Sequence, residues 1–169
     1  MKQSDFLKAV LPFKDKIFRL AKRLLVSTEE AEDATQELYF KLWNNKERLA
    51  DCKSVEAFAM TTTKNYCFDR LKSKQANNLS ITHNNYKEKD ACLDKKIENN
   101  DTVSLIHKLI EELPMQQKVI IQLRDIEQYE FDEIGKIVSM KPIAVRVALS
   151  RARKTIREKL IKKHSFGLS

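Results

Sequence analysis

Apolar residues recur every three or four positions along most of this chain, which is the spacing of amphipathic helices rather than of strands. In the first half, this spacing predicts a helix starting near Ser4 and further helices over about 13–26, 28–46 and 55–74. The run Ser-Thr-Glu-Glu at residues 27–30 is typical of a capping box at the start of the third of these helices.

The third predicted helix has two unlike faces when its residues are placed at 100° intervals. One face gathers small and aliphatic residues: Ala31, Ala34, Thr35, Leu38 and Leu42. The opposite face gathers carboxylates, an amide and one aromatic ring: Glu29, Asp33, Gln36, Glu37 and Phe40. Single exposed apolar residues are common on protein surfaces, but an exposed Phe40 among carboxylates also suits a protein partner.

The fourth predicted helix combines aromatic and basic side chains. Tyr66 and Phe68 lie near Lys64 and Arg70, and Trp43 precedes them in the third helix. Such a set suits a platform on which unpaired bases stack while cations hold the nucleic-acid backbone. Burial of the same rings in a hydrophobic core is the alternative, since Phe and Tyr are often buried.

The second half of the chain shows a sharper pattern. A helix ending before Pro114 leads to a second helix, a short amphipathic helix over 131–138, a turn at 139–141 and a last helix opened by Pro142. The last helix has an inward apolar stripe: Val145, Leu149, Ala152, Ile156 and Leu160. Its outward side is mainly basic: Arg146, Ser150, Arg151, Lys154 and Arg157. The pattern predicts a helix-turn-helix, whose second helix enters the major groove of DNA, and a hairpin with a solvated basic face is the alternative.

Residues 75–100 are rich in Asn and lack sustained apolar periodicity, so they are predicted to form a flexible linker. The predicted fold is all-α, with two small helical domains over 1–74 and 101–169 joined by this polar linker. A chain of 169 residues with only two Gly and three Pro agrees with a helical protein and argues against an all-β fold.

The net charge of +8 is unevenly distributed. Residues 136–163 carry ten Lys or Arg against one acid, whereas residues 28–37 carry five acids and no base. The basic end predicts a polyanionic partner and the acidic stretch a different one. No apolar run or leader suggests a membrane segment or export, so we expect a cytoplasmic protein without direct membrane insertion. The three cysteines, Cys52, Cys67 and Cys92, fit no disulfide framework or zinc site and are predicted to be free thiols.

Several motifs resemble the extracytoplasmic-function (ECF) sigma factors, which belong to the sigma-70 family. The runs at 113–126, 131–135 and 145–154 are similar to region 4 of that family. The run at 31–43 resembles its region 2, and Asn65 and Asp69 match its Asn-x-x-x-Asp segment.

This resemblance implies a sigma factor that binds core RNA polymerase and directs it to promoters. It implies contact with the clamp helices of the largest polymerase subunit by Asp33, Gln36, Glu37 and Phe40. It implies recognition and melting of the -10 element by Arg48, Lys53, Lys64, Asn65, Phe68, Arg70 and Lys72. It implies recognition of the -35 element by Lys141, Ile143, Arg146, Val147, Ser150, Arg151 and Lys154.

The remaining implied partners are the polymerase flap and an anti-sigma factor. We expect no catalytic residue, metal, cofactor or small-molecule substrate. The chain departs from the family pattern at the start of the last helix and at residues 61–63, where three threonines replace a more apolar run. Phe58 stands where the family usually has a Trp, and Ser139 stands where the turn usually has a Gly.

Two other functions fit parts of the sequence. A stand-alone helix-turn-helix regulator would bind operator DNA without polymerase, but it would leave the acidic stretch of the first half unexplained. A metal-dependent nuclease could use Glu29, Asp33 and Glu37, but no His or further acid converges on them in sequence.

Overall fold

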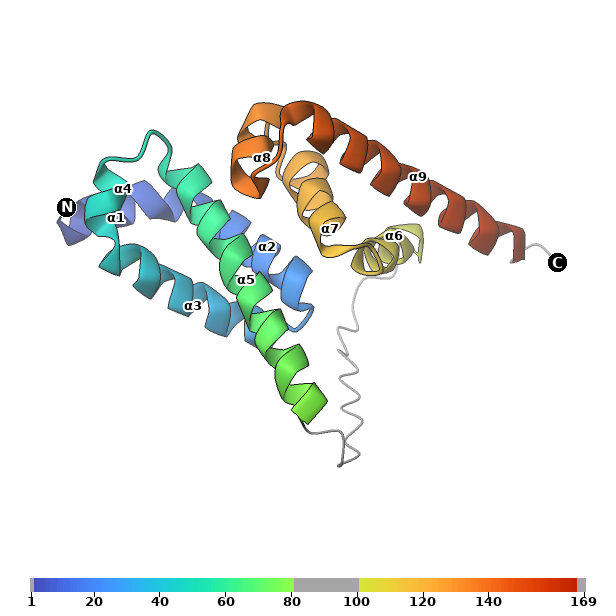
Figure 1. The fold of residues 1–169 in the computed structure, drawn as a ribbon, viewed down its shortest axis with the longest axis horizontal. Helices are drawn as coiled ribbons and strands as arrows, with labels where there is room; N and C mark the ends of the chain where they lie inside the picture. The colour runs from blue at the N-terminus through green and yellow to red at the C-terminus, as the bar shows by residue number, and fades with distance from the viewer. Residues whose placement is uncertain (1, 81–100, 167–169) are drawn as a thin grey trace.

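The computed structural model describes residues 2–80 and 101–166, and every regular element in these two ranges is a helix (Figure 1). The first range, the N-terminal block, contains α1 (Gln3–Val10), η1 (Leu11–Phe13), α2 (Lys14–Leu25), α3 (Thr28–Asn44), α4 (Lys46–Ala50) and α5 (Val55–Ser80). The second range, the C-terminal block, contains α6 (Asp101–Glu111), α7 (Met115–Ile121), η2 (Gln122–Ile126), α8 (Phe131–Val138) and α9 (Pro142–Phe166). The predicted all-α fold with two helical parts is therefore confirmed. None of the helices in the described ranges is both long and apolar enough to cross a membrane.

Helices α2 and α3 supply much of the core of the N-terminal block. On α2, Ile17, Leu20 and Leu24 are at most 1% exposed. The apolar face predicted for α3 is buried along its whole length: Ala31, Ala34, Thr35, Leu38 and Leu42. The start of α3 is fixed by the side chain of Ser27, which accepts a hydrogen bond from the backbone N–H of Glu30 at 3.4 Å. Burial of each large aliphatic side chain contributes about 1.5–3 kcal/mol, so this seam is a main source of the stability of the block.

Two helix ends differ from the sequence prediction. Helix α5 was expected to end near Lys74, yet residues 75–80 continue it, because the residues here include good helix formers and Lys74 forms an ion pair with Glu30 of α3. The rest of the predicted linker lies outside the described residues. The helix predicted over 28–46 divides at Asn45, whose ψ of 21° leaves the α-helical range, into α3 and α4.

The C-terminal block contains the predicted helix-turn-helix, formed by α8, the turn 139–141 and α9. Ser139 adopts the left-handed conformation, with φ 56° and ψ 45°, and its N–H bonds to the carbonyl of Gly135. A side chain at Gly135 would meet this turn, because a Cβ there would lie 2.6 Å from the carbonyl oxygen of Met140. Of the predicted inward stripe of α9, Val145, Leu149 and Ala152 are buried. Its last two members, Ile156 and Leu160, are half-buried.

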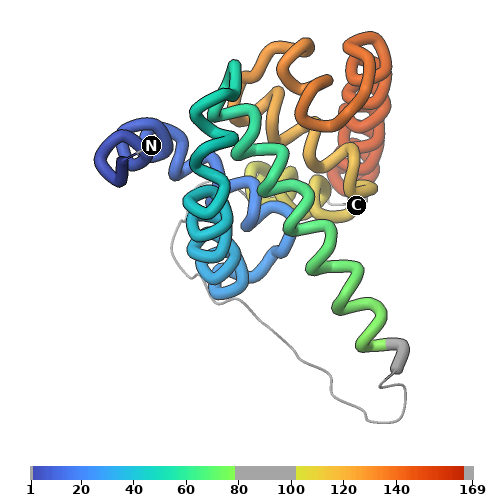
Figure 2. The backbone as a smooth tube through the Cα atoms, turned by 60° about the vertical axis from the view of Figure 1, so that its left-hand side comes forward, coloured from blue at the N-terminus to red at the C-terminus, as the bar shows by residue number. Residues whose placement is uncertain are grey.

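The two blocks pack directly against each other. Helices α2 and α5 of the N-terminal block face α7, η2 and α8 of the C-terminal block. Figures 1 and 2 place α3 and α9 on opposite outer sides of the molecule, each directed away from the other block. Helices α5 and α8, in contrast, pack against each other at the interface between the blocks.

Candidate nucleic-acid interface and acidic face

The outer side of the helix-turn-helix carries the side chains that the sequence assigned to the -35 element. All seven are exposed, and Ile143 at the start of α9 is 74% exposed. The set comprises Lys141, Ile143, Arg146, Val147, Ser150, Arg151 and Lys154. Because the opposite side of α9 packs on α6, α7 and α8, this basic side is the one that can enter a groove of duplex DNA.

Aromatic and acidic neighbours orient the arginines of this region. The ring of Phe131 lies between two guanidinium groups, 4.5 Å from that of Arg124 and 4.8 Å from that of Arg146. This cation–π contact holds Arg146 at the junction of α8 and α9. Arg153 forms a two-pronged ion pair with Asp125, with Nε 3.1 Å from Oδ2, and is therefore engaged within its own block. The guanidinium of Arg146 thus remains available to DNA, whereas that of Arg153 is occupied by Asp125.

The side chains assigned to the -10 element are spread over α4, α5 and the loop between them. Those at the surface are Arg48, Lys53, Asn65 and Lys72, and those half-buried are Phe68 and Arg70. The Arg70 guanidinium donates a 3.2 Å hydrogen bond to the Tyr66 hydroxyl, which is the main cause of the raised pKa of Arg70. The rings of Trp43, Tyr66 and Phe68 are partly buried and pack against the core, beside the exposed cations of this surface.

Three successive threonines of α5 replace a more apolar run of the sigma-factor pattern. Each hydroxyl donates to the carbonyl four residues earlier, at 2.8 Å, from Thr61 to Ala57, from Thr62 to Phe58 and from Thr63 to Ala59. Because these hydroxyls are satisfied inside the helix, the side chains present mainly their methyl groups to the surroundings.

Lys64 is the exception among the predicted DNA contacts. Its side chain points into the interface between the blocks, and the residue is only 8% exposed. Its ammonium group donates a 3.1 Å hydrogen bond to the backbone carbonyl of Ile137, in the last turn of α8. Burial lowers the pKa of Lys64, because the charged form loses solvation. In this structure the C-terminal block covers a cation that the sequence assigned to DNA.

The outer side of α3, termed the acidic face, presents Asp33, Gln36, Glu37 and Phe40. All four are exposed, and Phe40 reaches 61%. The prediction that the opposite face packs and this one is directed outward is therefore confirmed. Within residues 2–80 and 101–166, no three His, Cys, Asp or Glu side chains are grouped so that they could hold a metal ion.

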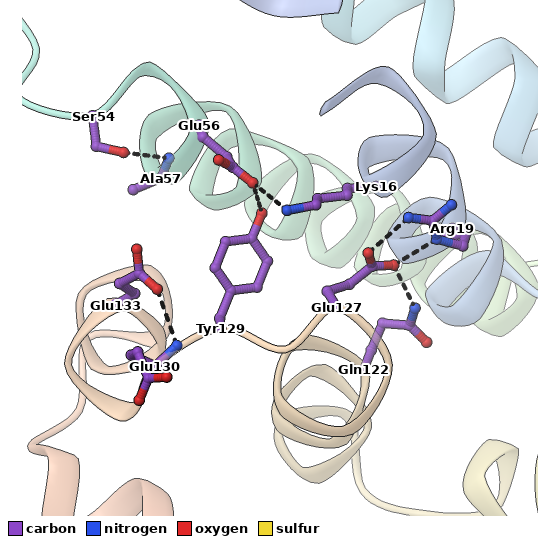
Figure 3. A network of polar contacts seen from close by, with 10 residues as sticks. All are labelled: Lys16, Arg19, Ser54, Glu56, Ala57, Gln122, Glu127, Tyr129, Glu130 and Glu133. Atoms are coloured by element: carbon purple, nitrogen blue, oxygen red, sulfur yellow. Dashed lines mark hydrogen bonds and ion pairs between the residues drawn. The ribbon is translucent and has the colours of Figure 1, made fainter. Parts of the chain in front are cut away.

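A polar network joins the two blocks, and the sequence reasoning did not find it (Figure 3). Arg19 of α2 donates two 2.7 Å hydrogen bonds to the carboxylate of Glu127, whose side chain is 2% exposed. The Tyr129 hydroxyl donates at 2.5 Å to Oε1 of Glu56, and Lys16 donates to the same oxygen at 2.7 Å. The two pairs that cross the interface, Tyr129–Glu56 and Arg19–Glu127, lie 73 and 108 residues apart, and no local spacing in the sequence indicates such pairs.

The pKa values of this network fit these hydrogen-bond roles. Burial by itself would raise the pKa of Glu56, but the hydrogen bonds from Lys16 and Tyr129 outweigh it, so the pKa lies below its usual value. Burial, and then the hydrogen bond to Glu56, raise the pKa of Tyr129 well above its usual range. At neutral pH a neutral hydroxyl therefore donates to a carboxylate, which is a strong form of hydrogen bond.

These features together define an all-helical, DNA-binding protein of the helix-turn-helix class with a second helical block that carries an acidic face on α3. Comparison with known protein families extends this description. The family described as "Sigma-70 region 2" matches residues 10–77, and the family described as "Sigma-70, region 4" matches residues 104–156. The chain belongs to the sigma-70 family of RNA polymerase sigma factors, in its extracytoplasmic-function group. The alternative of a stand-alone regulator is not favoured, because the N-terminal block matches region 2 as well.

Individual relatives agree along nearly the whole chain. The ECF RNA polymerase sigma factor SigW of Bacillus subtilis is 25% identical over 168 residues, which is 94% of this chain and 90% of the relative. The RNA polymerase sigma-H factor of Pseudomonas aeruginosa is 26% identical over 161 residues, 87% of this chain and 81% of the relative. A solved structure of the sigma factor RpoE in complex with the anti-sigma factor NepR from Bartonella quintana shares the fold. Its TM-score is 0.76 at 17% identity, with 94% of this chain and 97% of that chain covered.

Proposed function

We propose that this sigma factor binds core RNA polymerase through the acidic face of α3 and directs the enzyme to its promoters. The observation that carries this proposal is the exposure of Asp33, Glu37 and Phe40 on one outer side of the N-terminal block. Carboxylates steer the approach of a cationic partner, and an exposed ring supplies an apolar anchor. In line with the family resemblance, the proposed partner surface is the clamp helices of the largest polymerase subunit.

The DNA contacts are proposed to divide between the blocks. The exposed cations of α4, α5 and the intervening loop, with the half-buried rings of α5, would take the -10 element and its opened strand. The basic side of α9 would read the -35 element as duplex, with Arg146 near the turn and Arg151 one to two helical turns further on. We accordingly assign residues 1–74 to region 2, 101–169 to region 4 and 75–100 to the connecting segment.

An apolar groove in the C-terminal block is the proposed site for the polymerase flap. The cavity has a volume of about 370 Å³ and lies between α6, η2 and α9. Isoleucines line much of it: Ile106, Ile110, Ile121, Ile126 and Ile156. A groove of this kind accepts the apolar face of a partner helix, and it lies beside α9 without including the residues assigned to DNA.

The chemistry of RNA synthesis would belong to the polymerase, so this chain would contribute binding energy and promoter choice without catalysis. It would act in the cytoplasm, where polymerase and DNA meet. An anti-sigma factor is the proposed inhibitor, in line with the family and with the complex reported for the sigma factor of similar fold.

Co-elution with bacterial core RNA polymerase tests the central contact. The test variant carries Asp33→Lys and Glu37→Lys, and the matched control carries Asp5→Lys and Glu47→Lys, which change the charge equally at exposed positions outside α3. We expect stoichiometric co-elution of the wild type and the control, and loss of the test variant from the complex. Equal retention of both variants would contradict the acidic face as the polymerase contact.

A further inference from the structure

An aromatic ring at the edge of the helix-turn-helix lies between two arginines. Phe131, the first residue of α8, is half-buried. The centre of its ring lies 4.5 Å from the guanidinium carbon of Arg124, in η2, and 4.8 Å from that of Arg146, in the second turn of α9. Both distances lie within the range over which the face of a ring attracts a cation. The ring therefore connects the segment before the helix-turn-helix to the helix that is proposed to read DNA.

The two arginines are held in different ways. Arg124 donates a 2.8 Å hydrogen bond from Nη1 to the backbone carbonyl of Tyr129, and the same nitrogen lies 3.5 Å from a carboxylate oxygen of Glu130. Arg146 forms no hydrogen bond or ion pair within the described part of the chain, so the ring alone directs its guanidinium there. Arg124 thus fixes one side of Phe131, and Phe131 directs Arg146.

The contact with the ring leaves the hydrogen-bond donors of Arg146 unused. A cation–π contact acts on the positive charge and occupies no single N–H group. Arg146 is exposed on the side of α9 that also presents Ile143 and Ser150, three residues before it and four after it. Arg151 is exposed as well, but no aromatic ring contacts it within residues 2–80 and 101–166. Arg146 therefore combines free donors with a fixed direction, whereas Arg151 has free donors without one.

A fixed direction favours one kind of DNA contact over another. Guanine presents O6 and N7 in the plane of the base, and an arginine that binds both must align its guanidinium with that plane. A phosphate contact positions the protein without reading a base, and a mobile side chain can make it. Ordering a long side chain on binding lowers affinity, and a side chain that is ordered beforehand loses less. The ring thus favours a base contact by Arg146.

We propose that Phe131 is a positioning residue for promoter recognition. Its ring holds Arg146 in the direction in which the guanidinium pairs with O6 and N7 of one guanine in the -35 duplex. Phe131 acts through Arg146 and touches no base itself. The inference rests on the proposed function, because it takes α9 as the helix that reads the -35 element.

Nuclear magnetic resonance of the arginine side chains tests the ring contact without DNA or polymerase. In the full chain, the ring current of Phe131 should move the Hε signal of Arg146 upfield of the Hε signal of exposed Arg151. Phe131→Leu should remove this difference, and Phe131→Tyr, which keeps the ring, should retain it. Arg146→Lys and Arg151→Lys assign the two signals. Equal Hε shifts of the two arginines in the wild type would overturn the ring contact.

The base contact is tested with the holoenzyme formed by core RNA polymerase and the full chain. The probe is a promoter duplex that this holoenzyme selects from a pool of random upstream sequences. Each guanine of its -35 element is replaced in turn by 7-deazaguanine, which lacks the N7 acceptor. For the wild type we expect binding to weaken about tenfold at one guanine. Arg146→Ala should bind the two duplexes equally at that position, which identifies the guanine as its partner.

The ratio of the affinities for the guanine and 7-deazaguanine duplexes then isolates the role of Phe131. Phe131→Leu should lower this ratio from about tenfold to about threefold or less, because a guanidinium without the ring forms the paired contact in only part of the complexes. Phe131→Tyr should restore it. Phe18→Leu makes the same change at a half-buried ring of α2 and should keep the ratio at about tenfold. Both duplexes are compared on one protein sample, so a smaller folded fraction leaves the ratio unchanged.

The possible outcomes separate this proposal from the proposed function. A ratio in Phe131→Leu equal to that of the wild type would overturn the positioning role, even if binding to both duplexes became weaker. A wild type that is insensitive to 7-deazaguanine at every position would overturn the guanine contact. Failure of the holoenzyme to form, or to select any duplex, would instead contradict the proposed function, and the Hε signals would still decide whether the ring holds Arg146.

Discussion

Gly135 lies inside helix α8, where alanine would ordinarily be the more stable residue by about 1 kcal/mol. We predict the opposite sign here. A Cβ at this position would lie 2.6 Å from the backbone carbonyl oxygen of Met140 and 3.7 Å from the nitrogen of Pro142. The turn cannot move away freely, because the Met140 N–H also donates a 2.9 Å hydrogen bond to the carbonyl of Gly135. Such overpacking costs about 1–3 kcal/mol, and part of this cost is offset by helix propensity.

The net prediction for Gly135→Ala is a loss of about 1–2 kcal/mol in the free energy of unfolding. Urea denaturation followed by far-ultraviolet circular dichroism measures it, with an unchanged slope showing that the unfolded state is unaffected. Ser139→Gly is the matched control in the same turn. Its left-handed φ of 56° suits glycine, so this variant should gain about 1 kcal/mol. A Gly135→Ala protein as stable as the wild type, or more so, would refute the close packing of α8 on the turn.

Three further predictions concern the interface, the core and the DNA contact. Tyr129→Phe should lower the free energy of unfolding by about 1.5 kcal/mol above pH 4.5, because it removes the hydrogen bond to the Glu56 carboxylate. This loss should shrink as the pH falls through the lowered pKa of Glu56, because the carboxylate is then protonated. Urea denaturation midpoints measured across this pH range test it. A cost independent of pH would contradict the charged acceptor. Because burial raises the pKa of Cys67 to about 12, its thiol should stay unmodified by iodoacetamide at pH 8 until urea unfolds the chain. Arg146→Ala should weaken binding to -35 duplex by about 1–3 kcal/mol, measured by anisotropy, and an equal loss on scrambled duplex would identify a phosphate contact rather than a base contact.

The helix-turn-helix was predictable because its signals are local. The apolar spacing of α9 fixed which side faces inward, and Pro142 indicated where the helix begins. The two faces of α3 were predictable for the same reason, and the exposure of Phe40 followed from its position among carboxylates. In each case the information lies within one helix.

The interface between the blocks was not predictable, because its contacts join residues far apart in the chain. Nothing near Lys64 in the sequence distinguishes it from the exposed Lys72, and both read as candidates for DNA. Likewise, Glu56 and Glu127 look like ordinary surface acids until α5 and α2 are brought against the segment after η2, where Tyr129 meets Glu56 and Arg19 meets Glu127. The extension of α5 beyond Lys74 was missed because an Asn-rich stretch weakens periodicity without ending a helix.

This chain is a sigma factor that directs core RNA polymerase to specific promoters. The most direct test is transcription of a pool of genomic fragments by core enzyme, once with the chain and once without it. The 5′ ends of the transcripts are then mapped. We predict a limited set of new start sites that share two upstream elements and disappear with the Asp33→Lys, Glu37→Lys variant. The opposite result would be binding of the wild-type chain to the polymerase with no change in the mapped start sites relative to core enzyme alone, and it would contradict a role in promoter selection.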